Sequence, residues 1–194
     1  MYKVFVNDKP LFLTNEVIKE TDFQFFLLES IEVENLIVKM FQNKVQKAFL
    51  YHPDEKVLLK LFKEKIPVAK AAGGIVYNKN GEILFILRHG KWDLPKGGIE
   101  KKEKKKAAAI REVEEETGVT GMKITAKLQK TYHVFKRNGV YKLKLTNWYE
   151  MHTDFDGLPK GQIEEGIERV YWAKPEEIPA MLENSYENIK LLFE

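Results

Sequence analysis

The first 66 residues alternate short apolar runs with two amphipathic stretches. Apolar runs at 2–6 and 11–13 flank turn residues, which predicts a hairpin, and runs starting at Phe23 and Lys47 predict two further strands. Apolar positions of helical period predict two helices: Val33, Leu36, Ile37, Met40 and Phe41, and then, after Pro53 and Asp54, Val57, Leu58, Leu61 and Phe62. We expect residues 1–66 to form a small α/β domain.

A second pattern follows the charged segment that meets a proline at Ile66 and Pro67. Two hairpins are predicted around Asn-Gly turns, one at Asn80-Gly81 and one at Asn138-Gly139, with a long helix between them. The segment 168–173 reads as a last strand, and the chain from Pro175 onward reads as helical. Strands on both sides of one long helix predict a layered α/β domain over 67–194.

The charges of that long helix oppose its dipole. Lysines open the helix at 104–106, and glutamates close it, although the dipole favours the reverse order. Glu112, Glu115 and Glu116 are spaced i, i+3 and i+4, so their carboxylates share one face, while Glu114 points away. Carboxylates that converge in this way suit a hard cation, Mg²⁺ or Mn²⁺. The alternative is a solvated helix end in which Arg111 pairs with Glu115.

Composition narrows the classes of protein. The 194 residues are 44% hydrophobic and 31% charged, but the formal net charge is only +3, which favours neither nucleic-acid nor membrane binding. The chain has no cysteine, which excludes disulfides and thiolate sites, and its four histidines lack zinc-site spacing. No stretch of 18 apolar residues occurs. We therefore expect a cytoplasmic protein without a membrane partner.

The glutamates belong to a longer spaced pattern. It reads Gly-x5-Glu-x7-Arg-Glu-U-x-Glu-Glu-x-Gly-U, where U is aliphatic, and is occupied by Gly97, Glu103, Arg111, Glu112, Val113, Glu115, Glu116, Gly118 and Val119. This pattern resembles the signature box of the Nudix hydrolase superfamily at every defining position. The order of elements from about Ala71 onward is also similar to a Nudix domain. The resemblance implies an α/β/α sandwich with a mixed sheet, and a metal-dependent hydrolase of nucleoside diphosphate-linked compounds.

The resemblance also implies roles for individual residues. Glu112, Glu115 and Glu116 would bind the metal, together with a backbone carbonyl of Lys96 or Gly97. Glu103 and Arg111 would hold the box loop against the helix, and Gly118 would end the helix. The base that takes the proton of the attacking water varies in the superfamily, and two candidates remain here. They are Glu112 and the pair Glu164 and Glu165, for which plain surface sequence is an equal alternative.

The box departs from many of its relatives at two positions. Many boxes carry Gly where this chain has Lys102, and a capping Ser, Thr or Asp near Lys104. Lys104, Lys105 and Lys106 are expected to be solvated rather than to bind phosphate. The box loop is therefore expected to be less fixed than in the usual sequence.

The residues around the box indicate a subgroup. A Trp-x-x-Pro-Lys-Gly run from Trp92 to Gly97, and a later Trp-Tyr strand with an acidic loop, look most like dinucleoside polyphosphate and diphosphoinositol polyphosphate hydrolases. Basic residues suited to a polyphosphate chain are Arg88, Lys96, Arg137, Lys142 and Lys144. Lys142 and Lys144 lie on one strand face, and for each of them a plain solvent-facing position is slightly favoured. Trp92, expected in a loop, is the best candidate for stacking on a nucleobase.

Several functions remain open at this level. The leading expectation is a hydrolase of dinucleoside polyphosphates, with ADP-ribose, a noncanonical nucleoside triphosphate, diphosphoinositol polyphosphate and the 5′ end of RNA as rivals. A different class is a Nudix domain that senses a ligand without cleaving it. The N-terminal domain has no assigned role, and covering the substrate site and forming a homodimer are both open.

Overall fold

The computed structural model describes residues 1–18 and 24–194, which form two compact units. One unit contains Met1–Ala69 and Tyr132–Leu145, and the other contains Lys70–Thr131 and Thr146–Glu194. Phe23, with which a strand was predicted to start, lies outside the described residues. Each unit has its own hydrophobic core.

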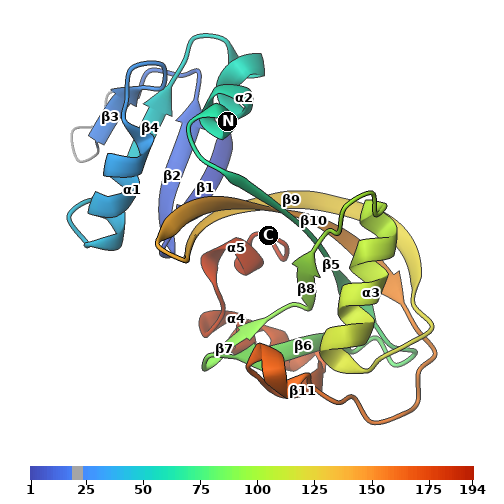
Figure 1. The fold of residues 1–194 in the computed structure, drawn as a ribbon. Coiled ribbons are helices and arrows are strands. Elements are labelled where there is room, and N and C mark those ends of the chain that lie inside the picture. Colours follow the sequence, from blue (N-terminus) through green and yellow to red (C-terminus); the bar gives the residue numbers. More distant parts are fainter. Residues whose placement is uncertain (19–23) are drawn as a thin grey trace. The chain divides into compact units, whose positions relative to one another are not determined.

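The N-terminal unit is a sheet covered on one face by two helices. Its elements are β1 (Tyr2–Val6), β2 (Lys9–Thr14), β3 (Gln24–Leu27), α1 (Val33–Phe41), β4 (Ala48–Tyr51) and α2 (Glu55–Glu64). β1 pairs antiparallel with β2, while β4 pairs parallel with both β2 and β3. Asp54 caps α2 by accepting a 2.9 Å hydrogen bond from the N–H of Lys56. The predicted strands and helices of this unit are confirmed within the described residues (Figure 1).

The tip of a long hairpin completes the N-terminal unit. Strands β9 (Lys123–Arg137) and β10 (Val140–His152) meet at the predicted Asn138-Gly139 turn, where both residues have a positive φ. β1 pairs parallel with β9 through Phe5–His133 and Val6–Val134. Residues 132–145 were expected in the 67–194 domain, but they pack with residues 1–69.

The second unit carries the box. Its remaining elements are β5 (Val68–Tyr77), β6 (Ile83–Arg88), β7 (Lys91–Asp93), β8 (Lys96–Gly98), α3 (Lys105–Thr117), a 3₁₀ turn (Ile163–Glu165), β11 (Ile167–Ala173), a second 3₁₀ turn (Pro175–Glu177), α4 (Ile178–Glu183) and α5 (Glu187–Lys190). β11 pairs antiparallel with β6, which also pairs with β7, while β8 pairs with β5. The predicted long helix, both hairpins and the last strand are confirmed.

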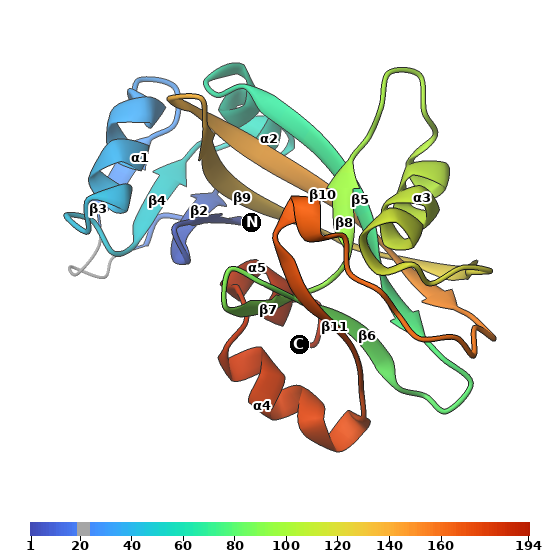
Figure 2. The same cartoon turned by 60° about the horizontal axis from the view of Figure 1, so that its bottom comes forward.

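Helices cover both faces of the strands in this unit. Ala72 and Val76 of β5 share one core cluster with Ala108, Ala109 and Val113 of α3. Alternate strand residues, including Ile75 and Phe85, share the opposite cluster with Met181 of α4 and Ile189 of α5 (Figure 1; Figure 2). With parallel and antiparallel pairs in its sheet, the protein has the α/β fold with a mixed sheet that was predicted. No helix in the described part of the chain is long and apolar enough to cross a membrane.

Candidate functional site

The box helix α3 lacks a side-chain cap at its N-terminus but has a glycine cap at its C-terminus. Lys104 stands at the N-cap position of α3 and makes no side-chain capping hydrogen bond. Gly118 ends the helix in the left-handed conformation, with φ of 68°, and its N–H donates to the carbonyl of Glu114 at 2.8 Å. Lys102 in the box loop also has a positive φ, of 69°. This backbone conformation favours glycine, which accounts for the Gly expected at that position.

Arg111 connects the box loop to the acidic end of the helix. Its Nε and Nη2 donate to the two carboxylate oxygens of Glu103, each at 2.9 Å, and Nη2 also donates to the carbonyl of Gly98 at 2.9 Å. Its Nη1 donates to Glu112 Oε1 and to Glu115 Oε2, both at 2.8 Å. The hydrogen bonds from Arg111 lower the pKa of Glu103 to about 2. One guanidinium thus neutralises part of the charge that the three glutamates bring together.

Glu116 is the most deeply buried of the box carboxylates, with 1% of its surface exposed. Its Oε2 accepts a 2.8 Å hydrogen bond from the backbone N–H of Lys96, whereas its Oε1 is buried and has no hydrogen-bond partner among the residues that the structure describes. Arg88 Nη1 lies 3.6 Å from Oε1, an ion-pair distance that is longer than a hydrogen bond. Burial raises the pKa of Glu116 to about 7, against the opposing effect of the Lys96 charge.

Gly97 makes room for Glu112. A Cβ added to Gly97 would lie 1.7 Å from Glu112 Oε2, while a Cβ added to the neighbouring Gly98 would meet nothing within 4 Å. The Glu112 carboxylate therefore lies directly against the backbone of β8. Burial raises the pKa of Glu112, and the hydrogen bond from Arg111 opposes that effect.

Arg88 links Glu116 to the acidic segment before β11. Glu165 stands at the end of the 3₁₀ turn 163–165, and its Oε2 lies 3.7 Å from Arg88 Nη2. Its side chain is 42% exposed. The charge of Glu165 also contributes, after burial and other causes, to the raised pKa of Glu112. Arg88 and Glu165, predicted at this site on different grounds, are thus brought beside the box carboxylates.

The residues present fit a hard divalent cation. Carboxylate oxygens are the ligands that Mg²⁺ and Mn²⁺ prefer, Glu116 Oε1 is buried without a hydrogen-bond donor, and Gly97 leaves the space in which the Glu112 carboxylate lies. Within 1–18 and 24–194, no group of three His, Cys, Asp or Glu side chains has the arrangement of a metal site. Glu112 and Glu115 both accept hydrogen bonds from the same nitrogen, Arg111 Nη1, so these two carboxylates face the guanidinium.

Two predicted substrate contacts have different surroundings from those expected. Lys96 is 6% exposed, and its ammonium donates a hydrogen bond to Asp93 inside the fold, so it does not extend toward solvent as a phosphate contact would. Trp92 lies on strand β7 rather than in a loop. Its ring packs against the cluster under α4 and α5, with its centroid 6.1 Å from that of Tyr171. Register pairs Trp92 with Leu87, so Trp92 and Arg88 point to opposite faces of the sheet.

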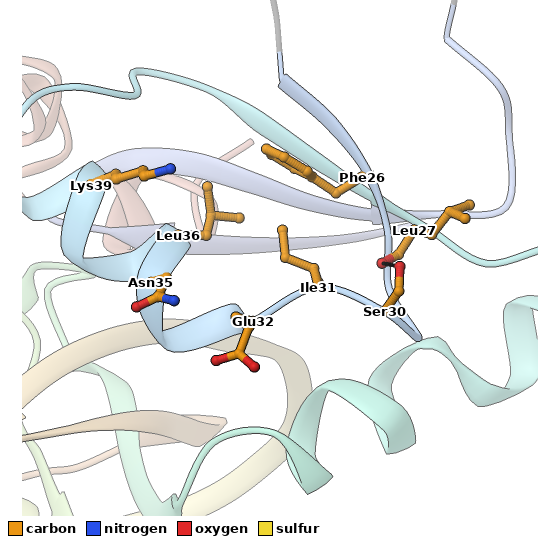
Figure 3. Close-up of a pocket in the computed structure, with 8 residues that line it drawn as sticks. All are labelled: Phe26, Leu27, Ser30, Ile31, Glu32, Asn35, Leu36 and Lys39. Atoms are coloured by element: carbon orange, nitrogen blue, oxygen red, sulfur yellow. Dashed lines mark hydrogen bonds between the residues drawn. The ribbon is translucent and has the colours of Figure 1, made fainter.

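Three other predicted contacts, Arg137, Lys142 and Lys144, belong to the N-terminal unit, whereas the box belongs to the other unit. The ammonium of Lys144 lies 5.2 Å from the ring centroid of Phe135. The N-terminal unit also holds a cavity of about 370 Å³ between β3 and α1 (Figure 3). It is lined by Phe26, Leu27, Ser30, Ile31, Glu32, Asn35, Leu36 and Lys39. Of these, only Glu32 and Lys39 are charged, and none was predicted as a site residue.

Sequence reasoning missed Asp93. This residue is 5% exposed, accepts the hydrogen bond from Lys96 and receives a 2.8 Å hydrogen bond from the N–H of Leu94. The available signal was the Asp-x-x-Lys spacing around Pro95, which places opposite charges on one side of a turn.

A family model, curated relatives and a solved structure are similar to parts of this chain. A model of the NUDIX domain matches residues 67–193. An RNA pyrophosphohydrolase of Bartonella tribocorum is 32% identical over 95 residues, which are 43% of this chain and 55% of that protein. Nudix hydrolase 25 of Arabidopsis thaliana is 33% identical over 126 residues, which are 54% of this chain and 72% of that protein. The chain thus spans little more than half of the Bartonella protein.

A solved structure is also similar to this chain. The MutT protein of Methanosarcina mazei has a TM-score of 0.54 and 25% sequence identity, covering 66% of this chain and 92% of that protein. The family match covers most of the chain and contains the whole box, from Gly97 to Val119. The chain therefore belongs to the Nudix hydrolase family, whose members generally use divalent metals.

Proposed function

We propose that this protein is a pyrophosphohydrolase that requires Mg²⁺ or Mn²⁺ and cleaves a nucleoside diphosphate-linked compound. The observation that carries the proposal is Glu116 Oε1, a buried carboxylate oxygen that accepts no hydrogen bond from the described residues, on the same helix face as the Glu112 carboxylate that lies against Gly97. A buried oxygen that accepts no hydrogen bond is unfavourable, and Arg88 Nη1 at 3.6 Å is too distant to donate one, so a bound cation would stabilise it. Glu112, Glu115 and Glu116 are the proposed metal ligands, with the carbonyl of Gly97.

The bound cation would neutralise phosphate charge and lower the pKa of the attacking water. The protein's own residues would hold the box loop in place and bind the phosphates. Arg111 and Glu103 hold the box loop on α3 through the paired hydrogen bonds at 2.9 Å. Arg88, 3.6 Å from Glu116 and 3.7 Å from Glu165, provides a positive charge for the phosphates at the same place.

Glu165 is the proposed general base. Its side chain is 42% exposed, so water reaches it, and Arg88 holds it near Glu116. Glu112 is the alternative, but it already accepts a hydrogen bond from Arg111 and lies against Gly97. Separate measurements of kcat for Glu165→Gln and Glu112→Gln in saturating metal distinguish the two. At a metal concentration that saturates both variants, we expect kcat to fall further in Glu165→Gln than in Glu112→Gln.

The proposed substrate class is a nucleoside 5′-polyphosphate, and first among these a dinucleoside polyphosphate, on the resemblance of the run from Trp92 to Gly97. A second candidate is the 5′ end of RNA, because several relatives that are 30–39% identical over the matched part are named RNA pyrophosphohydrolases. Both substrates present a phosphoanhydride at a nucleoside 5′ position. The same carboxylate site suits either of them.

A panel of substrates tests the proposal. Product release is measured with Mg²⁺ and with Mn²⁺ from dinucleoside polyphosphates, 5′-triphosphorylated RNA, ADP-ribose, noncanonical nucleoside triphosphates and diphosphoinositol polyphosphates. The variants are Glu115→Gln and, as a matched control on the same helix, Glu114→Gln, since Glu114 points away from the shared face. We expect one substrate class to be cleaved by the wild type and by Glu114→Gln, but not by Glu115→Gln.

Two other results would redirect the assignment. Equal turnover by Glu115→Gln and the wild type would show that the box glutamates are not needed for hydrolysis. No turnover of any substrate, combined with measurable binding of one of them, would favour a ligand-sensing Nudix protein.

A further inference from the structure

A buried ion pair lies beside Glu116 and has no part in the reaction as proposed. The side chains of Asp93 and Lys96 are 7% and 6% exposed. Lys96 Nζ donates to Asp93 Oδ2 and lies 3.4 Å from the carbonyl oxygen of Leu94. Its charge also lies 6.0 Å from the ring centroid of the fully buried Trp148.

Stability alone is a poor reason for such a pair. Removing two charges from water is unfavourable, and well-packed apolar residues in the same places are often as stable or more stable. A buried pair does fix the geometry of the groups that carry it, because breaking it leaves an uncompensated charge. The Asp93–Lys96 pair is therefore expected to hold a nearby group in place.

The backbone at Lys96 is held from a second side as well. The carbonyl of Pro95 accepts a 3.2 Å hydrogen bond from the N–H of Gly74. A Cβ added to Gly73 would lie 2.3 Å from that carbonyl oxygen and 2.4 Å from the Cβ of Lys96. The start of β8 thus approaches β5 as closely as a glycine allows. Lys96 is fixed by this contact on its backbone and by Asp93 at the end of its side chain.

The group fixed by this arrangement is the N–H of Lys96, which donates to Glu116 Oε2 at 2.8 Å. Fixing one oxygen of a carboxylate limits the directions in which the other oxygen can point. In Glu116 the other oxygen is Oε1, which is buried and has no hydrogen-bond partner. The orientation of Oε1 therefore depends on where the Lys96 backbone stands.

We propose that Asp93 and Lys96 are positioning residues for Glu116: their buried pair fixes the N–H that orients the carboxylate, so that Oε1 faces a bound divalent cation. Neither side chain touches the cation or the substrate. The inference rests on the proposed function, since it assumes that Glu116 is a metal ligand. It also gives the buried lysine of the Pro95-Lys96-Gly97 run a role other than binding phosphate.

The test measures binding of Mn²⁺ alone to the full chain, by electron paramagnetic resonance, together with the urea midpoint of unfolding. The variants are Lys96→Met, Asp93→Asn and the double variant, and the control is Lys79→Met at an exposed turn position. We expect at least about tenfold weaker Mn²⁺ binding in each single variant, as is usual when a partner behind a metal ligand is removed. In the double variant, which leaves no unpaired charge, the urea midpoint should recover while Mn²⁺ binding stays about tenfold weaker. Lys79→Met should match the wild type in both measurements.

A double variant that recovers both its urea midpoint and its wild-type affinity for Mn²⁺ overturns the inference and leaves the proposed function intact. A wild type that binds no Mn²⁺ overturns both. If the single variants do not fold, Lys96→Gln replaces them, because it keeps a donor for Asp93 without the charge. The backbone amide proton at position 96 is then followed by NMR in the wild type and in Lys96→Gln, and an unchanged shift with unchanged Mn²⁺ affinity overturns the inference. Once a substrate is known, kcat should fall in these variants while KM does not rise.

Discussion

Replacing Glu116 by Gln should make the metal-free protein more stable at neutral pH. Glu116 is 1% exposed and its pKa in the folded protein is about 7, because burial disfavours its charged form. In the unfolded chain the pKa of a glutamate is about 4.5. Between these two pH values the folded state keeps a proton that the unfolded state has lost. The free energy of unfolding therefore falls as the pH rises from 4.5 to about 7.

The size of the effect follows from the two pKa values. One pKa unit corresponds to about 1.36 kcal/mol, so the difference between 4.5 and about 7 amounts to about 3 kcal/mol above pH 7. Gln at position 116 has no charge to bury, and its amide oxygen still accepts the hydrogen bond from the N–H of Lys96. The stability gained by Glu116→Gln should thus be close to zero near pH 4.5 and about 3 kcal/mol at pH 8.

The assay is urea unfolding in a chelator, followed by tryptophan fluorescence, at four pH values from 5 to 8. The quantity read is the difference between variant and wild type, because other groups that titrate are common to both. Glu114→Gln is the control and should show no pH-dependent gain. Excess Mg²⁺ should reverse the order at pH 8, since binding stabilises only the protein that keeps the ligand. A difference that is flat with pH would refute the reasoning.

Three further predictions concern the box loop and the start of the helix. Lys102 has φ of 69°, an unfavourable conformation for a residue with a Cβ, so Lys102→Gly should raise the free energy of unfolding by about 0.5–1 kcal/mol. Lys101→Gly should not, and equal effects of the two changes would contradict this account. Lys104→Asp should add about 1 kcal/mol by capping α3, measured by the same urea unfolding, and no gain would show that the helix end is already satisfied. The pKa of Glu103, about 2 because of hydrogen bonds from Arg111, means that its contribution to stability is complete above pH 4.5 and lost as the pH falls toward 2. NMR titration should find that low pKa in the wild type and an ordinary value in Arg111→Ala.

The elements that the sequence predicted well are those with local signals. The stripe of apolar residues in α3, the stop at Gly118 and the two Asn-Gly turns depend on residues within a few positions of each other. The spacing of the box likewise identified the family. The lack of a capping side chain at Lys104 could also be read from the sequence, because an N-cap is formed by one residue and the backbone N–H groups of the first helical turn.

The differences arise from contacts between distant residues. Pairing of Phe5 with His133 joins the hairpin tip to the N-terminal unit, and no local pattern records it. Trp92 was expected to be available for stacking, but the face of β7 on which it lies is set by its register with Leu87. Lys96 was expected to contact a polyphosphate chain, yet it pairs with Asp93 inside the fold.

The contact between Gly97 and Glu112 offers the most direct test that the box carboxylates form the active site. Turnover by Gly97→Ala is compared with turnover by Gly98→Ala, using the substrate that the wild type cleaves. Neither glycine has a positive φ, but only the Cβ at position 97 would meet Glu112, at 1.7 Å from Oε2. We predict a loss of kcat of about tenfold or more for Gly97→Ala, with little change for Gly98→Ala. Equal turnover by the two variants would contradict it.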